Sequence, residues 1–288
     1  PTQEYLAYIP KAGADNARVL VSVHGISRNA NEQATVFWPY CERFGVVLVA
    51  PLFTPDYHKD YQRLGRDGRG LRADFMLDRC VEEVARLSGA DATQTHIFGY
   101  SGGAQFAHRY LMAHPHRVRR AVIAASGWYT MPDHRRRFPY GIRSTSRLPG
   151  VSFNPEEFLQ VPIEVLVGSD DTDDVHLKHT ARLDKQQGKN RVERARTWSE
   201  AMREASVLYG ISPRVSFTEV PETDHSFATF CRRGALVKRV FKHLFDESIG
   251  PNQRAVKISQ NGNLATAGRL FKKGTREAEI GSSQRNKS

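Results

Sequence analysis

Short apolar runs, several of them rich in β-branched residues, alternate with longer amphipathic segments through most of the 288-residue chain. The apolar runs have the length of strands, and their uninterrupted hydrophobicity is typical of a parallel sheet that is covered on both faces. We expect one strand to lead into Gly99 and others to lie at residues 5–9, 18–23, 46–53, 120–126, 163–167 and 214–220.

The segments between these strands carry apolar residues at helical spacing. Leu77, Val81 and Val84, for example, form one stripe within a predicted helix at residues 72–87. We expect further helices at about residues 29–44, 102–114, 191–208 and 228–245. Because strands and helices alternate, the sequence predicts an α/β fold in which a doubly wound, mostly parallel sheet is flanked by helices.

Two segments interrupt this alternation. Residues 131–160 contain four prolines and the run His134-Arg135-Arg136-Arg137, which predicts an irregular insertion with a cationic surface. Residues 251–288 are rich in Asn, Gln, Ser, Gly, Lys and Arg, and too poor in apolar residues to form a core. We therefore predict one domain at residues 1–250, followed by a basic, disordered tail that lies outside the fold.

The net charge of +11 is concentrated in these same two segments. Residues 251–288 hold eight basic and two acidic residues, and residues 131–150 hold five basic residues and one acidic residue. The rest of the chain is close to neutral, so a charged face spread over the fold, as nucleic-acid binding would need, is not indicated.

The cysteines and the amino terminus bear on the compartment. Cys41, Cys80 and Cys231 are widely spaced, which favours neither a disulfide framework nor a zinc site. Residues 1–10 lack the basic and apolar regions of a secretion signal, and no apolar run is long enough to span a bilayer. We expect a soluble, cytoplasmic protein.

The stretch Gly99-Tyr100-Ser101-Gly102-Gly103 follows an apolar run and precedes a helix-forming segment. Gly-x-Ser-x-Gly in that context is the pattern of a nucleophile elbow, a tight turn that lifts one serine clear of the sheet. Glycines are needed because a Cβ at position 99 or 103 would collide with the opposite segment. Ser101 is therefore the candidate nucleophile, and an ordinary helix start with a serine N-cap is the alternative.

Three other predicted strands also end in polar residues, at His24 to Asn29, Asp170 to Asp174 and Asp224-His225. The carboxyl ends of parallel strands share one edge of a sheet, so we expect these residues to gather near Ser101. A serine hydroxyl needs a base to become a nucleophile, and an imidazole suits that role, which makes His225 the candidate base.

A carboxylate is then needed to fix the imidazole tautomer and to stabilise the imidazolium. Asp170, Asp171 and Asp173 all lie in the acidic cluster and are candidates for this acid. Together with His176 and His179, the same cluster offers oxygen and imidazole ligands for a metal, although it lacks the glycine and closing glutamate of an EF-hand loop.

With its Ser, Asp, His order, the chain resembles the α/β-hydrolase superfamily over about residues 3–245. The resemblance is carried by four stretches: His24-Gly25, Gly99 to Gly103, Gly168-Ser169-Asp170-Asp171 and Asp224-His225-Ser226. Within the superfamily, the chain looks most like small intracellular esterases and the polyhydroxyalkanoate-depolymerase-like and dienelactone-hydrolase-like branches.

The resemblance implies a catalytic triad of Ser101, Asp171 and His225, with Asp171 preferred because it stands three residues after Gly168. The backbone N–H groups of Ile26 and Gly102 would form the oxyanion hole, and His24 would have a structural role.

The resemblance also suggests how a substrate is held. Tyr100 is expected to contact the substrate because it adjoins the nucleophile, and Trp128 and Tyr129 either line the pocket or belong to the core. The insertion at residues 131–160 occupies the position of a cap or lid. Its arginines Arg135 to Arg137 either favour anionic acyl groups or form a solvated loop.

We therefore expect a serine hydrolase that cleaves a carboxylic ester or thioester of a small molecule or polymer through an acyl-serine intermediate. It would need no cofactor and no metal. A peptidase or an acyltransferase could use the same triad, and a binding module could keep the fold without catalysis, because fold does not settle function.

Overall fold

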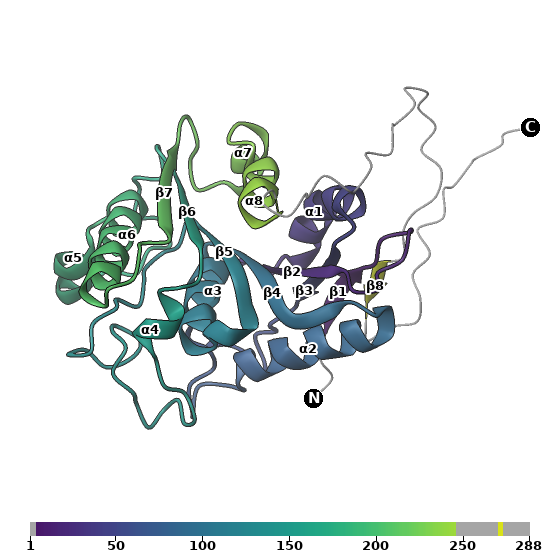
Figure 1. Cartoon of the computed structure of the whole chain (residues 1–288). Coiled ribbons are helices and arrows are strands. Elements are labelled where there is room, and N and C mark those ends of the chain that lie inside the picture. Colours follow the sequence, from purple (N-terminus) through teal and green to yellow (C-terminus); the bar gives the residue numbers. More distant parts are fainter. Residues whose placement is uncertain (1–3, 246–269, 273–288) are drawn as a thin grey trace, which may run out of the picture.

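The computed structural model describes residues 4–245 and 270–272 of the chain. Its strands form one eight-stranded sheet in the order β7-β6-β5-β4-β2-β3-β1-β8 (Figure 1). Strands β2 to β7 are parallel to one another, β1 pairs antiparallel with β3, and β8 pairs antiparallel with β1. The predicted doubly wound, mostly parallel sheet is confirmed.

The strands are β1 (Tyr5–Tyr8), β2 (Arg18–Val23), β3 (Val47–Pro51), β4 (Asp91–Tyr100), β5 (Val118–Ala124), β6 (Ile163–Gly168), β7 (Val215–Val220) and β8 (Leu270–Lys272). The α-helices are α1 (Ala30–Phe44), α2 (Ala73–Ser88), α3 (Gly102–Ala113), α4 (Pro155–Phe158), α5 (Ala181–Gln187), α6 (Arg191–Leu208), α7 (Phe227–Arg232) and α8 (Leu236–Phe245). Two 3-10 helices complete the described elements, η1 (Tyr61–Arg63) and η2 (Pro115–Arg117).

Alternate residues of the strands face two separate cores. In β2, Val19 and Val21 belong to a cluster with residues of α2, α3 and α6, whereas Leu20 belongs to a cluster with residues of α1 and α8. The two sets of helices accordingly lie on opposite faces of the sheet (Figure 1). Both faces are therefore covered, which explains why the strands are apolar at consecutive positions.

The helix expected at residues 228–245 is two helices, α7 and α8. Ala235 between them has φ 48°, a left-handed conformation that ends a helix. A Cβ at Gly234 would lie 2.7 Å from the carbonyl oxygen of Phe230, so the close turn requires glycine there. The break leaves α8 packed on the sheet through Val240 and Phe241 and leaves α7 beside the loop that follows β7.

The insertion at residues 131–160 packs beside the sheet. Its apolar side chains are buried in the same core cluster as those of α3, and they include Met131, Phe138, Ile142, Leu148, Val151, Phe153 and Phe158. Backbone carbonyls of the segment accept hydrogen bonds from Arg72 (to Pro149, 2.8 Å) and from Thr130 (to Pro139, 2.7 Å). Burying this much apolar surface favours packing against α3, and we call this segment the packed insertion. That it also serves as a cap or lid stays a prediction.

Three residues of the predicted tail belong to the sheet. Strand β8 pairs with β1 in the register Leu6 with Lys272, Ala7 with Phe271 and Tyr8 with Leu270. The prediction that residues 251–288 lie wholly outside the fold is therefore wrong for Leu270–Lys272. The remainder of that tail, at 251–269 and 273–288, lies outside the described residues.

The longest helix among the described residues, α6, has 18 residues and carries several charged side chains. Within residues 4–245 and 270–272, no helix has both the length and the apolar character needed to cross a membrane.

We expect a chain that ends at Gly250 to keep its activity, because β1, β3 and β2 separate β8 from the strand that carries Ser101. Loss of the β1 to β8 ladder should lower the free energy of unfolding by about 1 to 3 kcal/mol, at about 1 kcal/mol for each net hydrogen bond. Urea unfolding and ester turnover would measure both effects. A deletion of residues 273–288 alone keeps β8 and is the control. Equal stability of the two truncated proteins would contradict the prediction.

Candidate active site

Ser101 lies at the sharp turn between β4 and α3, with φ 53° and ψ −112°. A Cβ at Gly99 would lie 2.3 Å from the carbonyl oxygen of Gly103, and a Cβ at Gly103 would lie 2.0 Å from that of Val23. Real Cβ atoms do not approach so closely, so both positions require glycine, as the sequence predicted. A positive φ at a non-glycine residue is typical of strained functional turns, which favours the nucleophile elbow over an ordinary helix start.

The structure brings Ser101, His225 and Asp171 together in a hydrogen-bonded chain. Ser101 Oγ lies 3.0 Å from His225 Nε2, and His225 Nδ1 lies 2.8 Å from Asp171 Oδ2. Because a carboxylate only accepts, Nδ1 carries the hydrogen and Nε2 is left to accept the Ser101 hydroxyl. The other two candidate acids have different contacts: Asp170 accepts from the Ser169 hydroxyl, and Asp173 accepts from the Val175 N–H.

Two loops must meet for Asp171 to reach His225, and the end of β6 allows this. A Cβ at Gly168 would lie 2.1 Å from the carbonyl oxygen of Thr223, so only glycine permits this approach. The N–H of Asp170 then donates to the carbonyl of Thr223 at 2.9 Å, and the N–H of Ser169 donates to that of Val220 at 2.9 Å. Backbone hydrogen bonds therefore fix the loop of Asp171 against the loop that leads to His225.

Arg191, the first residue of α6, holds the other oxygen of Asp171. Its Nη1 donates to Asp171 Oδ1 at 3.0 Å, and its Nη2 donates to the carbonyl of Val175 at 2.6 Å. Asp171 is 0% exposed and Arg191 is 2% exposed, so the ion pair is shielded from solvent. Sequence reasoning missed Arg191, because an arginine at the start of a helix gives no sign that a loop will fold over it.

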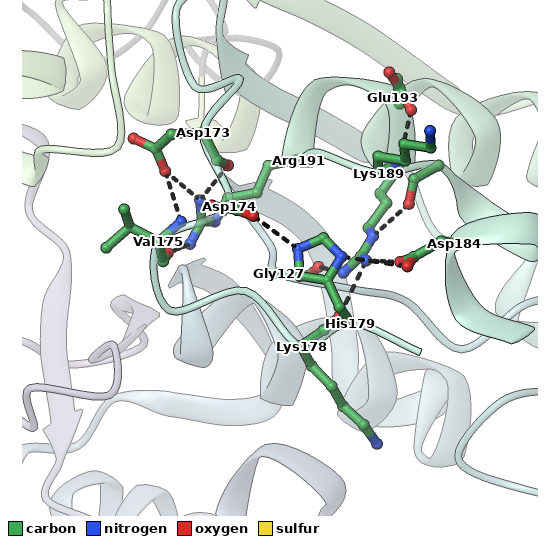
Figure 2. A network of polar contacts seen from close by, with 12 residues as sticks. Gly127, Asp173, Asp174, Val175, Lys178, His179, Asp184, Lys189, Arg191 and Glu193 are labelled. Atoms are coloured by element: carbon green, nitrogen blue, oxygen red, sulfur yellow. Dashed lines mark hydrogen bonds and ion pairs between the residues drawn. The ribbon is translucent and has the colours of Figure 1, made fainter. Parts of the chain in front are cut away.

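A second arginine one turn further along α6 fixes the rest of this loop. Arg194 is fully buried and donates to the carbonyls of Gly127 and Lys178, at 2.8 and 3.0 Å, and to the carboxylate of Asp184 at 2.7 Å. Figure 2 shows these groups around the loop, together with the contacts of Arg191. The first turn of α6 therefore determines the course of the segment that carries Asp171 and Lys178.

His24 shapes the turn after β2 and is not part of the hydrogen-bonded chain. Its Nε2 accepts the N–H of Phe53 at 3.0 Å, and its Nδ1 donates to the carbonyl of Gly25 at 2.9 Å. Burial lowers the pKa of His24 to about 4, which keeps the imidazole neutral. These contacts fix the backbone just before Ile26, in agreement with the structural role expected for His24.

Ile26 and Gly102 lie side by side next to Ser101. A Cβ at Gly102 would lie 2.9 Å from Ile26 Cγ2, and a Cβ at Gly25 would lie 3.6 Å from Ser101 Cβ. Within residues 4–245, no acceptor takes the backbone N–H of Ile26 or of Gly102. Two free amide donors therefore stand near the candidate nucleophile.

Ser101 and His225 line a cavity of about 570 Å³. Tyr100 and Trp128 also line it, and the Tyr100 hydroxyl donates to the backbone carbonyl of His225 at 3.0 Å. Tyr129 is not among the lining residues. It is fully buried and stacks on Trp198 with 4.8 Å between ring centroids, so its expected contact with substrate is corrected to a place in the core.

The cationic residues of the cavity differ from those that the sequence suggested. Arg135 to Arg137 do not line it, because the insertion packs against α3. Arg63 of η1, Lys178 of the loop after β6 and Arg191 of α6 line it instead. The proposed role of the insertion arginines in binding anionic acyl groups therefore has no support from the position of the insertion.

The acidic cluster was also a candidate metal site. Asp171 binds Arg191 and His225, whereas Asp174 and Asp184 lie on either side of His179, at 3.8 and 3.3 Å (Figure 2). In the described part of the chain, no three His, Cys, Asp or Glu side chains are grouped so that they could hold a metal ion. Asp171, Asp173 and Asp184 instead form ion pairs with Arg191 and Arg194.

No protein-family model and no curated protein matches this chain. Solved structures do match. The chain is similar to poly(aspartic acid) hydrolase-1 from Sphingomonas sp. KT-1, with a TM-score of 0.71 and 24% identity over 83% of this chain and 93% of that one. It is also similar to LpqC, a poly(3-hydroxybutyrate) depolymerase from Bordetella parapertussis, with a TM-score of 0.66 and 26% identity over 82% and 87% of the two chains.

An S-formylglutathione hydrolase from Agrobacterium tumefaciens matches with a TM-score of 0.55 and 14% identity, over 84% of this chain and 90% of that one. These neighbours share the fold predicted from the sequence motifs, which confirms the resemblance to the α/β-hydrolase superfamily. The protein therefore has the α/β-hydrolase fold.

Replacing Arg191 by methionine should impair both stability and activity. The substitution leaves the buried Asp171 carboxylate with one partner, so we expect about 3 kcal/mol less stability and at least about a tenfold fall in kcat/KM. Urea unfolding and ester turnover below the unfolding transition would measure these effects. Arg196→Met is the control, because Arg196 lies on the same helix, is half-exposed and pairs with Glu219. Wild-type kcat/KM in a folded Arg191→Met protein would contradict the prediction.

The lowered pKa of His24 predicts a loss of stability in acid. Between about pH 6.5 and pH 4 the unfolded chain binds a proton that the folded protein excludes, so stability present above pH 6.5 is lost as the pH falls. The free energy of unfolding, measured with urea, should fall between pH 7.5 and pH 5 by about 2 kcal/mol more in the wild type than in His24→Gln. The amide of the glutamine does not titrate but can still accept the hydrogen bond from the Phe53 N–H. Equal losses would contradict the assignment.

Proposed function

We propose that this protein is a serine hydrolase that cleaves a carboxylic ester or thioester through an acyl-Ser101 intermediate. The observation that carries the proposal is the hydrogen-bonded chain from Ser101 Oγ to His225 to Asp171, at 3.0 and 2.8 Å, at the wall of a cavity of about 570 Å³. Hydrolases and esterases among the structures of the same fold support it, including a depolymerase of a polyester.

The mechanism follows from the hydrogen-bond directions. His225 Nε2 takes the hydroxyl proton as Ser101 Oγ attacks the carbonyl carbon, and Asp171 stabilises the imidazolium that forms. The backbone N–H groups of Ile26 and Gly102 donate to the oxygen that becomes negative. His225 then gives its proton to the leaving group. In the second step, His225 takes a proton from a water molecule as that water attacks the acyl-serine.

The buried Arg191 supports this role for Asp171. The ion pair with Arg191 keeps one carboxylate oxygen occupied, so the other faces His225 in a fixed direction. A carboxylate held in this way favours the imidazole tautomer whose Nε2 can accept from Ser101. We assign Arg191 as a positioning residue, because it acts on the reaction through Asp171.

We further propose a reducing compartment such as the cytoplasm. Cys41, Cys80 and Cys231 form no disulfide with one another, and Cys41 and Cys80 are buried. Free thiols without disulfides are typical of proteins in a reducing environment.

Ser101→Ala should abolish both labelling by a fluorophosphonate probe and turnover of short-chain p-nitrophenyl esters, because the nucleophile is removed. We expect at least a thousandfold fall in kcat for this variant. Thr93→Ala, at an exposed position of the same strand, is the control and should label and turn over as the wild type does.

Two outcomes would contradict the proposal. A folded wild-type protein that neither labels nor hydrolyses esters would favour a binding module that keeps the fold without catalysis. Labelling at Ser101 with turnover of peptide or acyl-transfer substrates only would instead assign the same site to a peptidase or an acyltransferase.

A further inference from the structure

Gln62, Arg63, Gln105, Trp128 and Lys178 are among the residues that line the cavity, and we call these five the cationic wall. These residues come from η1, from α3 and from the loops that follow β5 and β6. Contacts with Trp128 bring one further charge, that of Arg109, to this wall and hold Lys178 on it. The guanidinium of Arg109 lies 4.2 Å from its ring centroid, and the ammonium of Lys178 lies 5.2 Å from it.

Arg109 is a buried cation without a direct ion-pair partner among residues 4–245. It is 0% exposed and donates to the Thr130 hydroxyl and to the carbonyls of Gln62 and Gln105, at 3.0, 2.7 and 3.1 Å. Its Nη2 has no hydrogen-bond partner, and no carboxylate in residues 4–245 forms an ion pair with it. A buried charge of this kind is costly, so an anion bound nearby would offset part of the cost.

Lys178 also has donor capacity to spare. Its Nζ donates to the Tyr140 hydroxyl at 3.0 Å and lies 5.3 Å from the Tyr140 ring centroid, so the packed insertion holds it beside Trp128. An ammonium group has three hydrogens, and no carboxylate of the described chain takes either of the other two. Its charge is therefore available to a group in the cavity.

Arg63 adds to the excess of positive charge. It pairs with the buried carboxylate of Asp60, but Arg66 binds the same carboxylate at 2.8 Å, so two guanidinium groups share one negative charge. Glu32 is the one acidic residue among those that line the cavity, and it is exposed. The charge of Asp171 behind His225 is already balanced by Arg191.

We propose that the cavity is selective for esters or thioesters that carry a carboxylate, which Lys178 and Arg63 bind on the cationic wall. This inference rests on the proposed function, because it names the substrate class of the same site. The carboxylate accepts hydrogen bonds from Lys178 Nζ and the guanidinium of Arg63, and such charge-assisted bonds are stronger than neutral ones. Arg109 contributes through its field, since it lies behind the wall.

The test compares esters that carry a carboxylate with the same esters in which that carboxylate is methylated and therefore neutral. One pair is mono-p-nitrophenyl glutarate and its methyl ester, which places the carboxylate in the acyl group. The other pair is 4-carboxyphenyl butanoate and its methyl ester, which places it in the leaving group. The measured quantity is the ratio of kcat/KM for the anionic ester to that for the neutral ester. At low ionic strength we expect the wild type to favour the anionic member of at least one pair by about tenfold, and to lose most of that preference in 0.5 M salt.

Lys178→Met and Arg63→Gln should each lower this ratio by about threefold to tenfold, mainly through KM for the anionic ester. Asp60 keeps Arg66 as its partner in the second variant, so its buried charge stays paired. Arg135→Gln is the matched control, because it removes an exposed arginine that lies outside the cavity, and it should leave the ratio unchanged. The pair that responds shows which part of the substrate carries the carboxylate.

Other results would overturn the inference. If the wild type hydrolyses neutral esters through Ser101 but neither variant changes the ratio in either pair, the selectivity is wrong and the proposed function stands. A ratio that falls as much in Arg135→Gln as in Lys178→Met would also overturn it, since overall charge would then be the cause. If no ester is hydrolysed, the proposed function fails and this inference fails with it.

Discussion

The buried carboxylate of Asp171 is the group on which the geometry of the candidate site depends. An unpaired carboxylate without contact to solvent would be costly, and here each of its oxygens has a partner of its own, Arg191 on one and His225 on the other. The end of β6, the start of α6 and the loop after β7 are joined at this single group. Any rearrangement that separates these three segments would leave the Asp171 carboxylate unpaired in an apolar environment. The free-energy cost of that unpaired charge stabilises the arrangement.

Much of this arrangement could be predicted because it depends on local patterns. Consecutive apolar residues predict strands buried on both faces, and the carboxyl ends of such strands lie on one edge, so Ser101 and His225 could be expected to meet although 124 residues separate them. The need for glycine at positions 99 and 103 could also be predicted, because a Cβ at either position collides with the backbone. The choice of Asp171 over its neighbours needed the resemblance to a known family as well.

The rest depends on contacts that no local pattern encodes. The sequence suggests that Arg191 and Arg194 are exposed charges on the surface of α6. They are buried because the loop after β6 folds across the start of the helix. The insertion looks irregular and cationic in sequence, yet its scattered apolar residues are enough to anchor it beside α3. Strand β8 has only three residues, and its place at the sheet edge is set by pairing with β1.

The requirement that buried charges have partners also connects the structure around the site to the charge of the site. Three arginines, Arg109, Arg191 and Arg194, are almost completely buried near the site, and each donates to backbone carbonyls. Two of them are balanced by carboxylates, Asp171 and Asp184, whereas Arg109 has only neutral acceptors. A guanidinium can bind several backbone carbonyls at once because it has five N–H donors in a fixed plane, but it always carries a positive charge. Arg109 contacts Gln62, Gln105 and Trp128 of the cationic wall, so the wall is positive as a consequence of how it is built. A substrate with a negative charge would complete the pairing that the protein leaves open.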